Sequence, residues 1–266
     1  MSLLAITSTI IPAVHDFAGL SRFYEDAYTR ASADAAVYAR WRALGAIGKA
    51  DHVVALCSRA RLPAGGHPLT TLEVGCGDGA LLCELHSRGF GGRLFGVEIS
   101  RAAVDIARRR AAIESVQLYD GVRVPAADRA YDLGVLSHVL EHVPDPPALL
   151  RELARACRAV LVEVPLEDNI SARRASKREH AAEVGHLQRL DRDGARAIVA
   201  RAGLAIAAEL DDPLPLAVHR FFAHGPRANT AATVKWAVRA GVHRLAPALA
   251  RRAFTVHYAC LCLPAA

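Results

Sequence analysis

A glycine-rich turn between an apolar run and a helical pattern constrains this chain more than any other feature. Residues 72–82 read Leu-Glu-Val-Gly-Cys-Gly-Asp-Gly-Ala-Leu-Leu, with glycines at alternate positions. Such a turn lets the backbone approach a ligand closely and presents the first N–H groups of the next helix. Nineteen residues after Gly79, a second apolar run ends in Glu98, at the position where doubly wound folds bind ribose hydroxyls. Together these features predict a site for an adenosine-containing cofactor.

Two familiar cofactor classes can be weighed on the residues alone. A phosphate-binding P-loop requires Gly-x4-Gly-Lys-Ser/Thr, but the stretch around Gly48-Lys49 has Ala43 at its first position and Ala50 at its last. This mismatch argues against a nucleoside triphosphate. A nicotinamide dinucleotide stays open, because Ala80 satisfies the last small position of Gly-x-Gly-x-x-Gly/Ala.

Two further motifs favour a third class of cofactor. A predicted strand over 116–119 is followed by Asp120-Gly121, and residues 131–146 read Tyr-Asp-Leu-Gly-Val-Leu-Ser-His-Val-Leu-Glu-His-Val-Pro-Asp-Pro. With the glycine-rich turn, these motifs resemble the class I S-adenosylmethionine-dependent methyltransferases, and most closely their small-molecule branch. The resemblance covers roughly residues 70–210. It is specific for the cofactor and the reaction, but not for the substrate.

The resemblance implies a fold, a cofactor and a set of binding residues. The fold is an α/β, Rossmann-like, doubly wound seven-stranded sheet whose last strand is antiparallel. S-adenosylmethionine would bind there and leave as S-adenosylhomocysteine, with Glu98 accepting from the ribose and Asp120 from the adenine amine. Asp120 could instead be a simple turn residue before Gly121. The implied cofactor-binding residues are Glu73, Gly75, Cys76, Gly77, Gly79, Glu98, Ile99, Asp120, Gly121 and Ser137.

The pattern of apolar runs predicts alternating strands and helices, and therefore parallel strands with helices on both faces. A helix is expected between each successive pair of the first five strands. Residues 204–210 form a sixth strand, and the terminal run 254–263 is the antiparallel seventh by resemblance. The first five strands are expected near 70–75, 93–99, 116–120, 131–137 and 159–164.

Residues 1–64 read as a helical N-terminal region, separated from a core of residues 65–266 by a Pro- and Gly-rich hinge over 63–68. The pairs Tyr24/Tyr28 and Tyr38/Trp41 have spacings that place each pair on one helix face. Two interpretations are open: an apolar stripe packed on the core, or a lid over cofactor and substrate.

Two connections, 165–190 and 211–253, are unusually long, and both begin where a parallel strand ends. Such ends face the ligand in open α/β sheets. The second connection predicts an amphipathic helix with Val234, Val238 and Val242 beside a basic stripe, interrupted at Pro247. The basic stripe fits a solvated surface, an anionic acceptor or a peripheral membrane contact. The basic residues in question are Arg173, Arg174, Lys177, Arg178, His180 and His186 in the first connection, and Lys235, Arg239 and His243 in the second.

Composition narrows the partners and the compartment. The net charge of +6 is carried by residues 226–253, which hold six basic residues and no acid, so the pattern does not favour a nucleic-acid binder. No apolar run approaches the ~20 residues of a membrane span, and residues 1–13 lack a signal-peptide pattern. Six cysteines without paired metal spacing predict buried free thiols and a cytoplasmic protein. The oligomeric state is left open.

Methyl transfer to oxygen or nitrogen also requires that a proton leave the acceptor, a task suited to neutral histidine. The candidate catalytic residues are His138, His142 and His186. His138 and His142 have i,i+4 zinc-ligand spacing, but without a third ligand in register we predict no metal. The sequence thus predicts a methyltransferase for a small acceptor bearing negative charge or a bulky apolar group. A nicotinamide-dependent oxidoreductase and a non-catalytic methyltransferase-like subunit are the alternatives.

Overall fold

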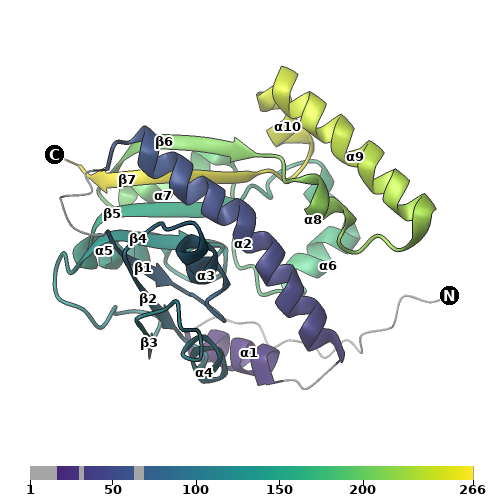
Figure 1. Cartoon of the computed structure of the whole chain (residues 1–266). Helices are drawn as coiled ribbons and strands as arrows, with labels where there is room; N and C mark the ends of the chain where they lie inside the picture. The colour runs from purple at the N-terminus through teal and green to yellow at the C-terminus, as the bar shows by residue number, and fades with distance from the viewer. Residues whose placement is uncertain (1–16, 30–32, 63–68, 266) are drawn as a thin grey trace.

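The computed structural model describes residues 17–29, 33–62 and 69–265, which form one seven-stranded sheet with helices on both faces (Figure 1). The strand order is β3-β2-β1-β4-β5-β7-β6. Strands β1 to β5 pair in parallel, whereas β7 is antiparallel to its neighbours β5 and β6. The predicted fold is therefore confirmed. The strands are β1 (Thr70–Val74), β2 (Arg93–Glu98), β3 (Ser115–Leu118), β4 (Tyr131–Ser137), β5 (Cys157–Pro165), β6 (Leu204–Asp212) and β7 (His257–Pro264).

The sheet separates two hydrophobic cores, and alternate residues of β5 feed each of them. Val160 and Val162 pack with helices α5 and α7, while Ala159 and Leu161 pack with α2, α3 and α4. The apolar run of β5 is continuous because helices cover both of its faces. Figure 1 shows α2 lying across one face of the sheet. The helices are α2 (Ala33–Arg59), α3 (Ala80–Ser87), α4 (Arg101–Ala107), α5 (Pro146–Ala156) and α7 (Arg192–Arg201).

The helix expected between β3 and β4 is absent, and this prediction is wrong. Residues 119–130 form an irregular connection instead. The Asp120 carboxylate accepts hydrogen bonds from the backbone N–H groups of Val122 and Arg123, which makes a turn rather than a helix start. Side chains of α5 take over the backbone groups that a helix would have paired: Glu152 accepts from Val124 N at 2.8 Å, and Arg155 donates to Val124 O at 3.1 Å.

The two long connections carry helices of their own. Residues 165–190 contain a short 3₁₀ turn and α6 (Ala175–Glu183); after β6 come α8 (Leu216–Arg220), α9 (Gly225–Leu245) and α10 (Pro247–Ala253). The break at Ala246, just before Pro247, is where the sequence predicts it. Figure 1 shows α9 and α10 extending beyond the sheet. Within the described residues, no helix combines the length and the apolar character needed to cross a membrane.

The prediction of buried free thiols is confirmed for five of the six cysteines. All six are free, and all but Cys83 are buried. Cys260 and Cys262 point to the same face of β7, with their sulfur atoms 3.6 Å apart.

The N-terminal region is helical where the structure describes it. Helix α1 spans Phe17–Thr29, and α2 follows it. Residues 1–16 and the expected hinge at 63–68 lie outside the described residues, so a domain boundary between 64 and 65 stays a prediction.

Candidate active site

The glycine-rich turn joins β1 to α3 at the carboxyl edge of the sheet. Gly77 has a φ of +53°, and a Cβ added there would lie 2.5 Å from the Tyr28 hydroxyl oxygen. Glycine is therefore required at this position for two reasons, the left-handed backbone and the close approach of α1. Gly79 is the N-cap of α3, and the turn is tied to β2 because Gly75 N donates to Val97 O at 2.8 Å.

Glu98, the last residue of β2, holds the turn in place. Its Oε2 accepts from Gly77 N at 2.9 Å, and its Oε1 accepts from Ile99 N at 2.7 Å and Ser100 N at 3.0 Å. Burial raises the pKa of this carboxyl group, and the three N–H donors oppose that shift. A carboxylate offers about four acceptor positions, so Glu98 retains capacity for a ligand hydroxyl.

Glu73 presents an oxygen atom without a partner. Its side chain is 5% exposed, and Oε2 accepts no hydrogen bond within the described residues. Burial raises the pKa of this carboxyl group to about 8. A buried acceptor in this state is costly unless a ligand pairs with it, so Glu73 is suited to receive a positively charged donor.

These side chains open into one cavity of about 2170 Å³. Its lining includes all three predicted catalytic histidines as well as most of the predicted cofactor residues. Asp120 lies in an exposed turn, the simpler role that the sequence left open, and Gly121 is buried. The predicted cofactor residues that line the cavity are Glu73, Gly75, Cys76, Gly77, Glu98, Ile99 and Ser137.

Helices α1 and α2 clamp the cofactor side of this cavity. Glu25 of α1 accepts from Ser100 Oγ at 2.9 Å and from Ala102 N at 3.1 Å. Arg42 of α2 pairs with Asp78 of the glycine-rich turn at 2.9 Å. Tyr38 is 51% exposed, so the aromatic stripe is not buried in the core. The aromatic side chains of α1 and α2 that line the cavity are Phe23, Tyr24, Tyr28, Tyr38 and Trp41. Closure of these helices as a lid stays a prediction.

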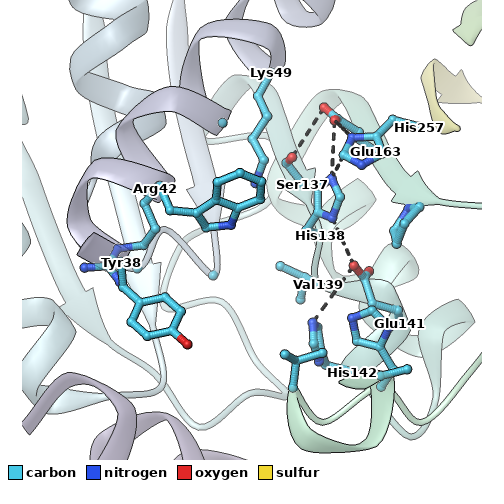
Figure 2. A pocket seen from close by; sticks show the side chains of 18 of the residues that line it. Tyr38, Arg42, Lys49, Ser137, His138, Val139, Glu141, His142, Glu163 and His257 are labelled. Atoms are coloured by element: carbon cyan, nitrogen blue, oxygen red, sulfur yellow. Dashed lines mark hydrogen bonds and ion pairs between the residues drawn. The ribbon is translucent and has the colours of Figure 1, made fainter. Parts of the chain in front are cut away.

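The histidine pair at positions 138 and 142 does not form the expected helical spacing. His138 follows β4 with a left-handed φ of +58°, and only a 3₁₀ turn over Leu140–His142 comes next. Both rings still approach Glu141 Oε1, His138 Nδ1 at 3.3 Å and His142 Nε2 at 3.9 Å, but their other partners differ. His138 faces Glu163 and His257 (Figure 2). The His142 ring packs against His186, with ring centroids 4.7 Å apart.

Glu167 fixes the orientation of the His186 ring. Its Nδ1 lies 2.7 Å from Glu167 Oε2, and its side chain is 12% exposed. A carboxylate at Nδ1 fixes the tautomer and leaves the Nε2 lone pair available. Its neighbour His142 faces Gly185 O through Nδ1 at 3.1 Å, which anchors the first long connection beside β4.

Four buried or half-buried residues of the site were missed by the sequence reading. Glu163 of β5 is 1% exposed and is approached by His52, His138 and His257. Burial would raise the pKa of Glu163, but hydrogen bonds from these histidines lower it well below its usual range. Asp212 contacts the far side of His52 at 3.2 Å. Two features of the sequence could have indicated them: Glu163 is a charged residue inside the apolar run of β5, and His257 is the first residue of the terminal strand.

The basic residues of the two long connections meet at the rim of the cavity. Burial lowers the pKa of Lys235, and repulsion from Arg239, Lys177 and Arg174 lowers it further. Two valines of α9, Val234 and Val238, are each 59% exposed, and Val238 lines the cavity beside Lys235 and Arg239. Arg239 donates to Thr255 O at 2.6 Å and stacks over the Phe254 ring. The rim residues lining the cavity are Arg174, Lys177, His180, Arg189, Lys235 and Arg239.

Comparison with known proteins agrees with this architecture. A family model described as a methyltransferase domain matches residues 39–209. The chain is 32% identical over 90 residues to a ubiquinone biosynthesis O-methyltransferase of Neisseria meningitidis, covering 32% of this chain and 37% of that protein. The same-named enzyme of Acinetobacter baylyi is 29% identical over 96 residues, covering 34% and 38%. The matches thus span less than two fifths of these relatives' length.

Solved structures share the fold at low identity. Geranyl diphosphate C-methyltransferase from Streptomyces coelicolor superposes with a TM-score of 0.59 at 16% identity, covering 82% of this chain and 77% of that one. Phosphoethanolamine N-methyltransferase 2 of Haemonchus contortus superposes with a TM-score of 0.63 at 14% identity, covering 92% and 61%. The antiparallel β7 between β5 and β6 also differs from the all-parallel order of dinucleotide-binding folds. The nicotinamide interpretation therefore has no support.

Proposed function

This chain belongs to the methyltransferase domain family, and on that premise we propose that it transfers the methyl group of S-adenosylmethionine to an oxygen or nitrogen atom of a small anionic acceptor. One observation carries the proposal: the unpaired Glu73 oxygen and the Glu167-oriented His186 open into the same cavity. The first fits a cofactor, and the second fits an acceptor that must lose a proton.

The residues at the glycine-rich turn fit the cofactor. The partnerless Glu73 Oε2 suits the ammonium of the methionine part, and the spare acceptor capacity of Glu98 suits the ribose hydroxyls. The turn at Gly77 keeps the space that a side chain would fill. When bound, the cofactor supplies an electrophilic methyl group on a positively charged sulfur.

On the acceptor side, His186 Nε2 takes the proton of the attacking hydroxyl or amine. The C–S bond breaks as the C–O or C–N bond forms, and the electron pair stays on the sulfur of S-adenosylhomocysteine. The chain's main contribution is to hold the acceptor in line with the methyl group. His142 packs against His186 and fixes its position.

The rim indicates the charge of the acceptor. Lys235 belongs to α9, whereas Lys177 belongs to α6 and Arg174 is the N-cap of that helix, yet both lie close enough to lower the pKa of Lys235. Like charges held together in this way attract an anion. Methyl transfer to oxygen is supported by the relatives in ubiquinone biosynthesis. The lid role of α1 and α2, a non-nucleic-acid partner and a peripheral membrane contact stay predictions.

The test has two stages. Tryptophan-quench titration should show saturable binding of S-adenosylhomocysteine and none of NADH. S-adenosylhomocysteine release is then measured over a panel of small phenols and amines, each offered with and without a carboxylate or phosphate. We expect turnover with anionic members of the panel. Binding of NADH, or cofactor binding without turnover on any member, would contradict the proposal, the latter in favour of a non-catalytic subunit.

A further inference from the structure

Three ligand-type atoms form a nearly equilateral triangle at the acceptor end of the cavity. His138 Nε2 lies 3.2 Å from His257 Nδ1 and 3.4 Å from Glu163 Oε1, and the third side, from His257 Nδ1 to Glu163 Oε1, is 3.2 Å. The sheet register produces this arrangement. His138 follows β4, Glu163 is near the end of β5, and β7 begins with His257 alongside Pro165.

These distances match those between the ligands of a single metal ion. Nitrogen and oxygen ligands bind Zn²⁺ at about 2.0–2.2 Å, which places tetrahedral ligand atoms about 3.3–3.6 Å apart. Two imidazoles and one carboxylate also form a donor set that binds divalent transition metals in preference to Mg²⁺ or Ca²⁺.

The groups behind the triangle are arranged as supports for metal ligands. His138 Nδ1 lies 3.3 Å from Glu141 Oε1, a buried carboxylate oxygen that accepts no hydrogen bond within the described residues, so the Glu141 charge lies behind the ring while Nε2 faces the triangle. The second oxygen of Glu163 is contacted by His52 Nδ1 at 3.3 Å and by Ser137 Oγ at 3.4 Å. Metal-binding histidines and carboxylates in proteins are oriented by partners of this kind. Without a metal, His138 and His257 donate to Glu163; a bound cation would replace those protons and pair with the same three atoms.

We propose that His138, Glu163 and His257 bind one divalent transition-metal ion, with Zn²⁺ as the reference ion. The site has an open side. Glu163 is 1% exposed and forms its floor, while the His138 and His257 side chains are 22% and 17% exposed and line the cavity (Figure 2). A fourth position facing a cavity is typical of catalytic rather than structural zinc. An acceptor oxygen would fill it; this last step, unlike metal binding itself, rests on the proposed function.

A second group, Glu141, His142 and His186, also has its ligand atoms within 4.8 Å of one another. It is the weaker candidate because its ligand atoms lie farther apart than those of the triangle. His186 Nδ1 lies 2.7 Å from Glu167, and His142 Nδ1 faces Gly185 O. The closest approach of His142 Nε2 to the Glu141 carboxylate is 3.9 Å. This group therefore serves as the comparison in the test.

The test uses the full chain after chelator treatment, titrated with Zn²⁺ by calorimetry and with Co²⁺ by visible absorption. We expect one equivalent to bind, with the intense absorption of a four-coordinate Co²⁺ centre. His138→Gly removes one ligand while suiting the left-handed backbone, and it should weaken binding by at least about 100-fold, as should His257→Ala. His186→Ala should bind the metal like the wild type.

Two results would overturn the site. One is the absence of stoichiometric binding to the wild type; the other is loss of binding in His186→Ala with retention in His138→Gly. Circular dichroism and S-adenosylhomocysteine titration of each variant establish that it is folded. They also separate failure of the metal site from failure of the methyltransferase assignment, because cofactor binding does not need the triangle.

Discussion

The two ends of the cavity are built in different ways. At the cofactor end, the residues lie within one stretch of chain, from Glu73 to Ser100, and the main contacts join a carboxylate to backbone N–H groups. At the acceptor end, His52, Glu163 and His257 come from a helix and two strands, and side chains contact one another directly. The first end depends on local backbone geometry. The second depends on the whole sheet being assembled in register.

This difference predicts which substitutions act on which ligand. A change at the glycine-rich turn should affect cofactor affinity, whereas a change among the acceptor-end side chains should leave cofactor affinity intact and alter turnover. The predictions below test that separation.

The largest effect is expected for Gly77→Val. The new side chain would meet the Tyr28 hydroxyl and would force valine into a left-handed backbone, so S-adenosylhomocysteine binding should fall below detection. Gly203→Val is the matched control, because Gly203 has a φ of +76° but nothing within 4 Å of an added Cβ. Isothermal titration of both variants is the measurement. Equal affinity losses in the two would show that backbone strain alone, and not obstruction of the site, is responsible.

Next in size is His186→Ala, which tests the acceptor end. Loss of a general base costs typically 10²–10⁴-fold in kcat, while the Kd of S-adenosylhomocysteine should not change. Glu167→Gln should cause a smaller loss, because it only disturbs the orientation of the ring. His86→Ala, on exposed α3 surface, is the control. A drop in cofactor affinity that parallels the drop in kcat would break the proposed separation of the two ends.

The sequence predicts the backbone geometry of the cofactor end because its determinants are local. The glycine spacing, the run into α3 and the position of Glu98 are all contained in one βαβ unit. The prediction of a helix between β3 and β4 was wrong because the Asp120 side chain accepts from the backbone N–H groups of the residues that follow it and forms a turn. That competition between side chain and backbone is not visible in the periodicity of apolar residues.

The acceptor end was only partly predictable. The three histidines were identified, and so were the basic residues of α9, but Glu163 and His257 are 94 positions apart and meet only through the antiparallel pairing of β5 with β7. The direction in which α9 faces was also open. Val234 and Val238 are each 59% exposed, no residue of α9 is fully buried, and Lys235 and Arg239 line the cavity, so this helix does not pack on the core by its apolar face.

Glu98→Ala should weaken S-adenosylhomocysteine binding by about 1.5–3 kcal/mol, the size of a lost hydrogen bond to a charged group, or roughly 10–150-fold. Part of this effect comes through Gly77, whose N–H loses its acceptor. Glu114→Ala, an exposed carboxylate paired with Arg93, should have no effect. Titration calorimetry measures both, and an unchanged Kd in Glu98→Ala would contradict the ribose role.

Cofactor affinity should also depend on pH through Glu73. Burial raises the pKa of its carboxyl group to about 8, so Glu73 of the ligand-free protein is protonated at neutral pH. The carboxyl group must lose that proton to pair with the cofactor ammonium. Between pH 6 and 7.5, the affinity should therefore rise by close to tenfold per pH unit. Glu73→Gln should bind more weakly than the ionised wild type and show no such rise. The Kd for S-adenosylhomocysteine against pH is the measurement, and a flat wild-type profile would refute the pairing.

The same shift has a consequence for folding. Because the folded-state pKa of Glu73 lies above its unfolded value, the protonated carboxyl stabilises the fold at low pH. That contribution declines as the pH rises from the unfolded pKa towards about 8. Glu73→Gln should consequently lose less stability than the wild type between pH 6 and 8 in denaturant titrations.

The smallest effect is expected at the rim, where the charges are partly exposed. Charge reversal at Lys235 and Arg174 should raise the KM of an anionic acceptor several-fold, and the wild-type KM should climb with salt, since exposed charges are screened over about 8–10 Å at ordinary ionic strength. Cofactor affinity should stay the same.

Arg173→Glu is the matched control, because the exposed Arg173 guanidinium faces Asp168 rather than the cavity. If Arg173→Glu raised the KM as much as Arg174→Glu, the effect would come from overall charge. A KM that did not change with salt concentration would mean that the aromatic side chains of α1 and α2 select the acceptor, and that the basic rim is a solvated surface.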